Sequence, residues 1–214
     1  MSVLLMRLSG PMQAWGVQSR FGVRDTGREP SKSGVVGLLA AALGRPRQAP
    51  VADLAALRMG VRVDREGVLL RDYHTAQNVY RAKGGVKDTE LSTRYFLADA
   101  AFLVGLEGDE TLLNKLFAAL RDPQWSLFLG RRAFVPGEPI WLSDGLRGGA
   151  LEAELHPSAT PWLTGIPNTY PLVRMVIEDY TGSEVRTDQP LSFHPRRFAP
   201  RRVINEYRNL ELSV

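Results

Sequence analysis

Four basic side chains follow one another at intervals of four residues and lead into the start of an apolar helix. They are Arg20, Arg24, Arg28 and Lys32, followed directly by Ser33 and Gly34. A helix N-terminus carries free backbone amides and the positive end of the helix dipole, so it is a natural seat for a phosphate. The segment therefore predicts an anion-binding site. The alternative is a solvated basic loop whose glycines serve helix packing.

A second group of residues could bind a nucleobase. The segment GPMQAWG (10–16) places a tryptophan and a glutamine between glycines, just after a short apolar run. Trp15 offers a flat face for stacking on a base, and Gln13 can hydrogen-bond to a base edge. The alternative is that Trp15 closes the core and the glycines form a turn, because tryptophan is highly buried on average.

A third group could cut RNA or merely hold it. A ribonuclease without a metal needs a base near the 2′-hydroxyl and a cation on the scissile phosphate. His74, Tyr80 and Lys83 supply these groups within ten residues. In the alternative interpretation His74, Arg81 and Lys87 grip a nucleic-acid backbone and the chain has no catalytic residue. We favour the second interpretation, because proximity in sequence does not establish geometry.

Arginine dominates the basic residues. Of the 27 Lys and Arg side chains 23 are Arg, and some occur in pairs, as at Arg131 and Arg132. The planar guanidinium suits phosphate and stacks on bases. Each neutralised phosphate would add to the salt dependence of binding. The alternatives are a solvated surface, a protein interface, or the coding bias of a GC-rich genome.

Composition excludes several classes of protein. The chain has 214 residues, of which 44% are hydrophobic and 23% charged, as in an ordinary globular protein. Cysteine is absent and no two of the three histidines have ligand spacing, so we predict no disulfide, metal site or cofactor. The longest apolar run, 35–43, is far shorter than the roughly 20 residues of a membrane span. We expect a cytoplasmic protein without membrane contact.

The hydrophobic pattern predicts an α+β fold whose first half has the order strand, helix, strand, strand, helix, strand. The first expected elements are a strand over 2–8, a helix over 35–43 capped by Ser31 or Ser33 and ended by Gly44, and a short helix over 52–58. A hairpin of 59–63 and 68–73 follows, and then a loop-like excursion over 74–94. The last elements are a strand over 95–106, a helix that begins after Asp109 and stops at Pro123, and a strand within 127–135. This order is the ferredoxin-like pattern, which RNA-recognition modules share. We therefore predict a ferredoxin-like first domain at 1–135.

The remaining residues, 136–214, have a different texture. Prolines and glycines are frequent there, with short β-like runs at 151–155 and 172–177 and a basic segment at 193–202. We expect a β-rich C-terminal part packed on the first domain.

Five segments together resemble the CasD-type subunit of the type I-E CRISPR surveillance complex, Cascade. They are GPMQAWG (10–16), RDTGREPSKSGVVGLLAAALG (24–44), LRDYHT (70–75), YFLADAAF (95–102) and FLGRR (128–132). The resemblance implies that residues 1–135 form a ferredoxin-like, RRM-like RNA-binding domain with a protruding β-hairpin thumb at about 74–95. It implies a non-catalytic subunit for antiviral defence that holds the 5′ handle of the crRNA. Its expected partners are a CasC-type backbone subunit and a CasA-type large subunit, with target DNA adjacent.

Under this resemblance, the residues quoted above become a predicted RNA-binding set. The set comprises Gln13, Trp15, Arg20, Arg24, Arg28, Lys32, Ser33, Gly34, His74, Arg81, Lys87, Arg131 and Arg132. No strand carries an RNP-type aromatic run, so RNA is expected on loops, the helix N-terminus and the thumb. Relatives in another CRISPR subtype cut the repeat RNA themselves. A metal-independent endoribonuclease using His74, Tyr80 and Lys83 therefore stays as the alternative function.

Overall fold

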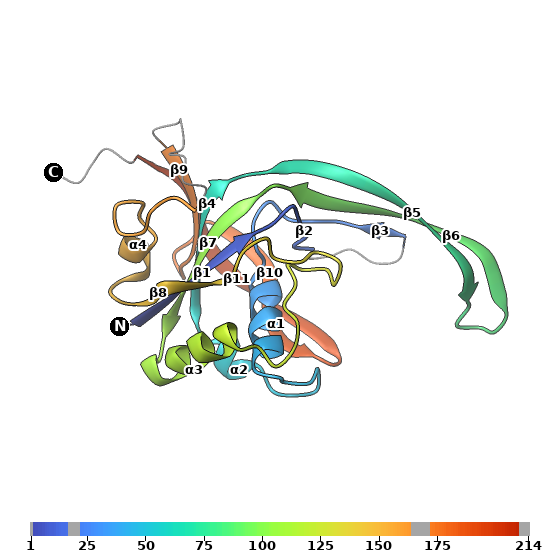
Figure 1. The fold of residues 1–214 in the computed structure, drawn as a ribbon, viewed down its shortest axis with the longest axis horizontal. Helices are drawn as coiled ribbons and strands as arrows, with labels where there is room; N and C mark the ends of the chain where they lie inside the picture. Colours follow the sequence, from blue (N-terminus) through green and yellow to red (C-terminus); the bar gives the residue numbers. More distant parts are fainter. Residues whose placement is uncertain (1, 17–21, 164–171, 210–214) are drawn as a thin grey trace.

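The computed structural model describes residues 2–16, 22–163 and 172–209, which form two β-sheets with helices packed on the larger one (Figure 1). The larger sheet has seven strands in the order β10-β11-β9-β4-β7-β1-β8, and all its pairings are antiparallel. Its strands are β1 (Ser2–Ser9), β4 (Arg58–Arg65), β7 (Ala101–Gly108), β8 (Trp141–Gly148), β9 (Leu172–Glu178), β10 (Glu184–Phe193) and β11 (Arg196–Asn209).

The smaller sheet is built around a long hairpin. Its strands are β2 (Met12–Gln13), β3 (Val23–Arg24), β5 (Val68–Tyr80) and β6 (Val86–Ala98). β5 and β6 pair antiparallel from Val68 opposite Ala98 to Tyr80 opposite Val86. The short strands β2 and β3 pair with the C-terminal half of β6. Figure 1 shows the hairpin reaching far out from the body of the molecule.

Both faces of the large sheet are covered. Strand β1 shows this by its alternation: Leu4 and Met6 belong to a core beneath two helices, whereas Val3 and Leu5 belong to a second core on the other face. The helices are α1 (Lys32–Ala42), α2 (Ala52–Ala55), α3 (Glu110–Arg121) and α4 (Leu151–Glu154). Helices α1 and α3 cover the first core and α4 covers the second.

Helix α1 begins and ends as its sequence predicts. Ser31 is the cap rather than Ser33, and its hydroxyl accepts a hydrogen bond from the Gly34 amide. At the other end Gly44 has φ +67°, a conformation that favours glycine. Its amide bonds to the Ala41 carbonyl and the Arg45 amide to the Ala40 carbonyl, so the last carbonyls are satisfied. The expected helix after Asp109 is likewise confirmed, because Asp109 caps α3.

The predicted hairpin of 59–63 with 68–73 is wrong. Strand β4 pairs with β7 and β9, and the chain leaves the large sheet at 66–67 before β5 pairs with β6. The region 74–94, expected as an excursion with little pattern, forms most of two long strands. Its residues are mostly exposed, so the alternation of apolar and polar side chains that marks a half-buried strand is missing.

Four other boundaries differ from the prediction. The segment 127–135 forms no strand, and the last strand of the expected order is β8. The run 151–155 forms helix α4 instead of a strand. The run 95–106 is two strands, because Asp99 has φ +54° and interrupts it. The helix expected over 52–58 ends at Ala55, and β4 starts at Arg58.

The C-terminal strands continue the large sheet, since β9 pairs with β4 and β11 pairs with β9. Strands from both sides of residue 135 therefore share one sheet. The division into 1–135 and 136–214 stays a prediction. No helix in the described ranges has the length and hydropathy needed to cross a bilayer.

Candidate nucleic-acid interface

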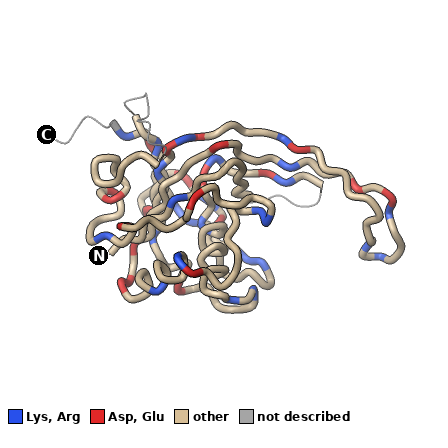
Figure 2. The backbone as a smooth tube through the Cα atoms, in the orientation of Figure 1, with Lys and Arg blue, Asp and Glu red and all other residues tan. Residues whose placement is uncertain are grey.

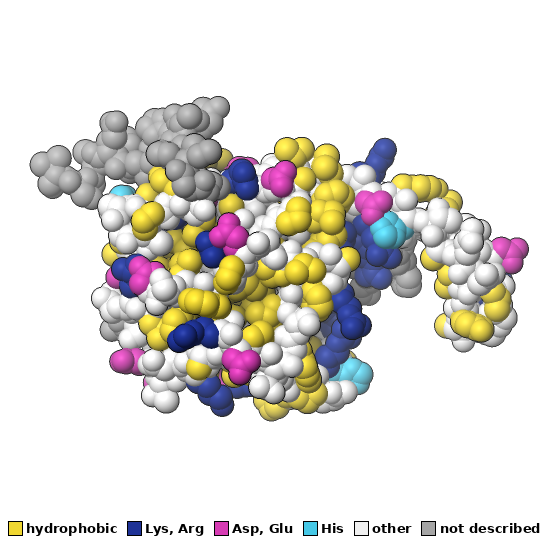
Figure 3. Space-filling view, in the orientation of Figure 1, with side chains coloured by type: hydrophobic (Ala, Val, Ile, Leu, Met, Phe, Trp, Pro, Cys, Tyr) yellow, Lys and Arg dark blue, Asp and Glu magenta, His cyan; other side chains and the backbone are white. Residues whose placement is uncertain are grey.

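A groove of about 970 Å³ runs beside helix α1. Among the described residues, its walls carry one carboxylate, Asp25, and six arginines: Arg24, Arg45, Arg47, Arg131, Arg132 and Arg196. In Figure 3 dark-blue side chains gather along the side of the body from which the hairpin projects. Such an excess of positive charge in a concave surface attracts an anionic ligand. Arginine is also the side chain best suited to phosphate.

The arginines at the start of α1 form a tight cluster. The Arg131 guanidinium donates to the backbone carbonyls of Arg24 (3.2 Å) and Asp25 (3.3 Å) and lies 5.5 Å from the ring centre of Phe134. Burial lowers the pKa of Arg131, and the nearby positive charges of Arg94 and Arg24 lower that pKa further. A bound phosphate would relieve this repulsion, so the cluster is suited to an anion.

The N-terminus of α1 is less available than its sequence suggests. The Lys32 amide donates to the Asp188 carboxylate at 2.7 Å, and the Gly34 amide is used by the Ser31 cap. The protein therefore supplies its own anion to the helix dipole. Ser33 and Gly34 do line the groove, but the arginines are the lining residues best suited to a phosphate.

The Lys32 side chain is buried and does not line the groove. It is 1% exposed, and its ammonium donates to both carboxylate oxygens of Glu178, at 2.9 and 2.8 Å. Burial lowers the pKa of Lys32, while the hydrogen bonds to Glu178 oppose that effect. The expectation that this ammonium contacts RNA does not fit its position. It ties α1 to strand β9 instead.

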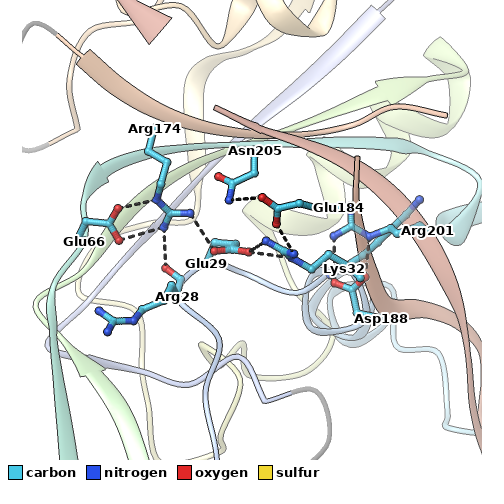
Figure 4. Close-up of polar contacts among 10 residues, drawn as sticks. Arg28, Glu29, Lys32, Glu66, Arg174, Glu184, Asp188, Arg201 and Asn205 are labelled. Carbon is cyan, nitrogen blue, oxygen red and sulfur yellow. Dashed lines mark hydrogen bonds and ion pairs between the residues drawn. The ribbon is translucent and has the colours of Figure 1, made fainter. Parts of the chain in front are cut away.

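Two groups of polar contacts hold the start of α1 and the segment before it against the C-terminal strands (Figure 4). Arg174 donates to both oxygens of Glu66 and to the carboxylate of Glu29. Arg201 donates to both oxygens of Asp188, at 2.6 and 3.0 Å. Figure 2 shows basic and acidic positions close together in the body. Much of the basic charge is therefore paired inside the protein.

Gln13 and Trp15 also lie in the interior. Trp15 is 1% exposed, and its indole N–H donates to the Gln13 side-chain oxygen at 3.2 Å. The Gln13 amide group donates to the carbonyls of Leu8 and Ala100. The indole packs against the first turn of α1, where a Cβ on Gly34 would lie 2.8 Å from the ring. Trp15 borders the groove although its side chain is buried, and Gln13 lies behind it. The alternative interpretation, in which Trp15 closes the core, fits this position.

The hairpin carries the residues that were candidates for cutting RNA. His74 contacts the Asp72 carboxylate and lies opposite Ser92, whereas Lys83 lies in the turn that follows β5. Tyr80 is six residues beyond His74 on the same strand, a separation of about 20 Å. The three side chains are therefore spread along the hairpin and do not converge on one phosphate.

The other predicted contacts have the following places. Arg28 and Arg81 are exposed, and Lys87 pairs with Glu90 on the hairpin. Arg20 lies outside the described residues. Within the described ranges, no cluster of three or more His, Asp or Glu side chains is arranged to hold a metal.

Sequence reasoning missed Arg45, Arg47 and Trp125, which line the groove, and noted Arg196 only as part of the basic segment 193–202. Arg45 and Arg47 follow Gly44, the glycine that ends α1. Their place directly after a predicted helix could have marked them as candidates for the groove. Nothing in the sequence placed the segment after α3 beside α1. Only the fold brings Gln124 to the end of α1, where its amide donates to the Ala42 carbonyl at 3.0 Å.

Known proteins resemble this chain over nearly its whole length. The sequence model of a family described as CRISPR-associated protein (Cas_Cas5) matches residues 3–209. The CRISPR system Cascade subunit CasD of Escherichia coli (strain K12) is 33% identical over 223 residues, covering 94% of this chain and 93% of that subunit.

Two solved structures also match. A Cas protein known from a crystal structure is 47% identical, with a TM-score of 0.79, and the match covers 98% of this chain and 96% of that one. A chain of a CRISPR RNA-guided surveillance complex is 36% identical, with a TM-score of 0.82, over 97% of this chain and 90% of that one. These matches confirm the resemblance to CasD-type subunits. The chain belongs to the Cas5 family of CRISPR-associated proteins.

Proposed function

We propose that this chain is the CasD-type subunit of a Cascade-like surveillance complex and holds the 5′ handle of the crRNA in the groove beside α1. The observation that carries the proposal is the charge of that groove, where the described walls hold six arginines and one carboxylate. The relatives include a Cascade subunit and a chain of an RNA-guided complex, which supports RNA as the anion. Such a complex acts in antiviral defence.

We assign the first half of the chain to the ferredoxin-like, RRM-like class. The support is the strand order β4-β7-β1-β8, with α1 and α3 on one face. The order of elements along the chain is also that of the class. The β5–β6 hairpin would be the thumb, longer than expected because it spans 68–98 rather than about 74–95. Strands β9–β11 would form the packed C-terminal part.

The hairpin and the groove would have separate partners. The crRNA handle would lie in the groove, and the projecting hairpin would reach the junction with the target DNA. A CasC-type subunit, one of those that form the backbone of the complex, would contact this chain. A CasA-type large subunit would lie next to this chain. We place this assembly in the cytoplasm.

The role we propose is positioning rather than catalysis. His74, Tyr80 and Lys83 are spread along the hairpin, and His74 is already engaged by Asp72. The arginines would fix the RNA backbone while unpaired bases are left free for contact. The endoribonuclease alternative predicts a discrete cut in repeat RNA in EDTA that disappears in His74→Ala. We expect intact RNA on a denaturing gel.

A double variant tests the groove. Arg24→Ala with Arg132→Ala removes two exposed cations from the cluster at the start of α1. Binding of a fluorescein-labelled oligouridylate is followed by anisotropy at several salt concentrations. We expect at least a tenfold loss of affinity, because hydrogen bonds to charged groups are worth about 1.5–3 kcal/mol each. A plot of log K against log salt concentration has a negative slope, and the double variant should make that slope shallower by about 1.4. This is about 0.7 for each lost phosphate contact on a single strand.

The matched control is Arg147→Ala, which removes an arginine on β8 that does not line the groove. Its affinity and slope should equal those of the wild type. Equal affinity and slope in the double variant as well would show that RNA binds elsewhere and would overturn the site assignment.

A further inference from the structure

The two ends of the groove differ in their chemistry. At the start of α1 lie Arg24, Arg131 and Arg132, as described above. At the other end, beside the last turn of α1, the wall carries Trp125 and Arg47. Trp125 is 49% exposed, which is unusual for so large an apolar ring on a protein surface. We call Trp125 and Arg47 the far subsite.

The far subsite is poorly suited to a cluster of phosphates. It lies at the negative end of the α1 dipole, which disfavours anions. The Arg45 guanidinium there is already bonded to both oxygens of Asp53, at 2.7 and 2.6 Å, and to the Pro50 carbonyl. Within the described chain, Arg47 has no ion-pair partner and remains exposed. One uncommitted cation beside a flat aromatic ring is the combination that binds a nucleobase and a neighbouring phosphate.

Trp125 is held in place through the backbone of its neighbour. The Gln124 amide donates to the Ala42 carbonyl at 3.0 Å. A Cβ on Gly44 would lie only 3.0 Å from the Gln124 Cβ, so Gln124 packs closely against the end of α1. An anchored backbone next to the ring reduces the conformational entropy that is lost when a ligand binds there. The exposed indole is therefore suited to stacking.

The spacing of the two ends suits a single strand of RNA. Helix α1 has 11 residues, so its ends are separated by about 16 Å at 1.5 Å per residue. At roughly 3.4 Å per stacked nucleotide, that distance corresponds to about five nucleotides. An RNA whose phosphates are held at the start of α1 therefore reaches the far subsite.

We propose that Trp125 stacks on one unpaired base of the bound RNA, about five nucleotides from the phosphates held by Arg24 and Arg132, with Arg47 on an adjacent phosphate. This inference rests on the proposed function, since it requires RNA in the groove. It adds a base-binding position at the end of the groove that the sequence did not indicate.

The test uses the full chain, oligoadenylate labelled with fluorescein, and a set of oligoadenylates that each carry one abasic nucleotide. Trp125→Ala should weaken binding of oligoadenylate about tenfold, within the range found for base–aromatic stacking. Trp125→Phe should retain most of the affinity. An abasic nucleotide at one position should weaken wild-type binding by a similar factor and add nothing in Trp125→Ala, because both changes remove the same contact.

Tyr180→Ala is the matched control, because Tyr180 is 90% exposed and does not line the groove. Its affinity should equal that of the wild type, and thermal unfolding should show Trp125→Ala to be as stable as the wild type. Wild-type RNA affinity in Trp125→Ala would overturn the inference. If that variant also lost binding of a partner subunit, Trp125 would belong to a protein interface instead. A wild-type chain that binds no RNA would overturn the proposed function itself.

Discussion

Replacing Gly130 with alanine is expected to destabilise the protein and to weaken RNA binding together. Gly130 has φ +89°, and a Cβ there would lie 1.7 Å from the Ala14 carbonyl oxygen. The backbone of 14–16 cannot yield easily, because Trp15 beside it is packed in the core. The strained φ and the clash together should cost about 2–5 kcal/mol of unfolding free energy. Relief of the clash would move Arg131 and Arg132 out of the groove.

Urea unfolding and oligouridylate binding measure the two effects of Gly130→Ala. RNA affinity of the folded variant should fall about tenfold, as expected when a charged hydrogen bond is lost. The control is Gly148→Ala, where an added Cβ meets nothing within 4 Å and φ is not in the left-handed region. That variant should match the wild type in both measurements. A stable Gly130→Ala protein with normal affinity would show that this glycine does not position the two arginines.

Lys32→Met is expected to reduce stability by about 3 kcal/mol while RNA affinity of the folded protein stays unchanged. The substitution keeps the size of the side chain but removes the cation closest to the Glu178 carboxylate. The cation that remains near Glu178 is the more distant Arg201, at 3.7 Å. A carboxylate that loses its closest cation in a largely buried position raises the free energy of the folded state, even with the Met59 amide and Arg201 still near it. Combining Lys32→Met with Glu178→Gln removes that charge and should recover part of the lost stability.

Urea unfolding again provides the measurement, and Lys115→Ala provides the control. Lys115 lies exposed on α3, so its replacement should change stability by no more than about 0.5 kcal/mol. The opposite pattern, with normal stability and weakened RNA binding in Lys32→Met, would place Lys32 at the RNA interface and contradict its assignment to the buried polar contacts.

Helices α1 and α3, which pack on the first core, could be predicted from sequence, and the exposed hairpin strands could not. An apolar run between Ser31 and Gly44 indicates helix α1, and the cap residue Asp109 indicates α3. The hairpin strands β5 and β6 lie mostly in solvent, so their pattern carries no period of two. The loop at 127–135 resembled a strand because its apolar residues Leu129 and Phe134 are buried, although neither belongs to a strand.

The candidate site shows a similar division. Arg24, Arg131 and Arg132 were chosen for their charge and lie in the groove. Lys32 was chosen for the same reason and lies in the interior, because its carboxylate partner is 146 residues away in the sequence. No local pattern shows such a partner. Trp15 and Trp125 are the same type of residue, so residue type alone could not show which is exposed. The fold buries Trp15 and exposes Trp125.

The central claim is that RNA lies in the arginine groove beside α1. The most direct measurement is ultraviolet crosslinking of a 4-thiouridine RNA to the full chain, followed by mass spectrometry of the crosslinked peptides. The account predicts crosslinks in peptides that contain the groove walls at 24–25, 45–47 and 124–132, and their loss in Arg24→Ala with Arg132→Ala. Crosslinks confined to α3 or β8, unchanged in the double variant, would contradict it.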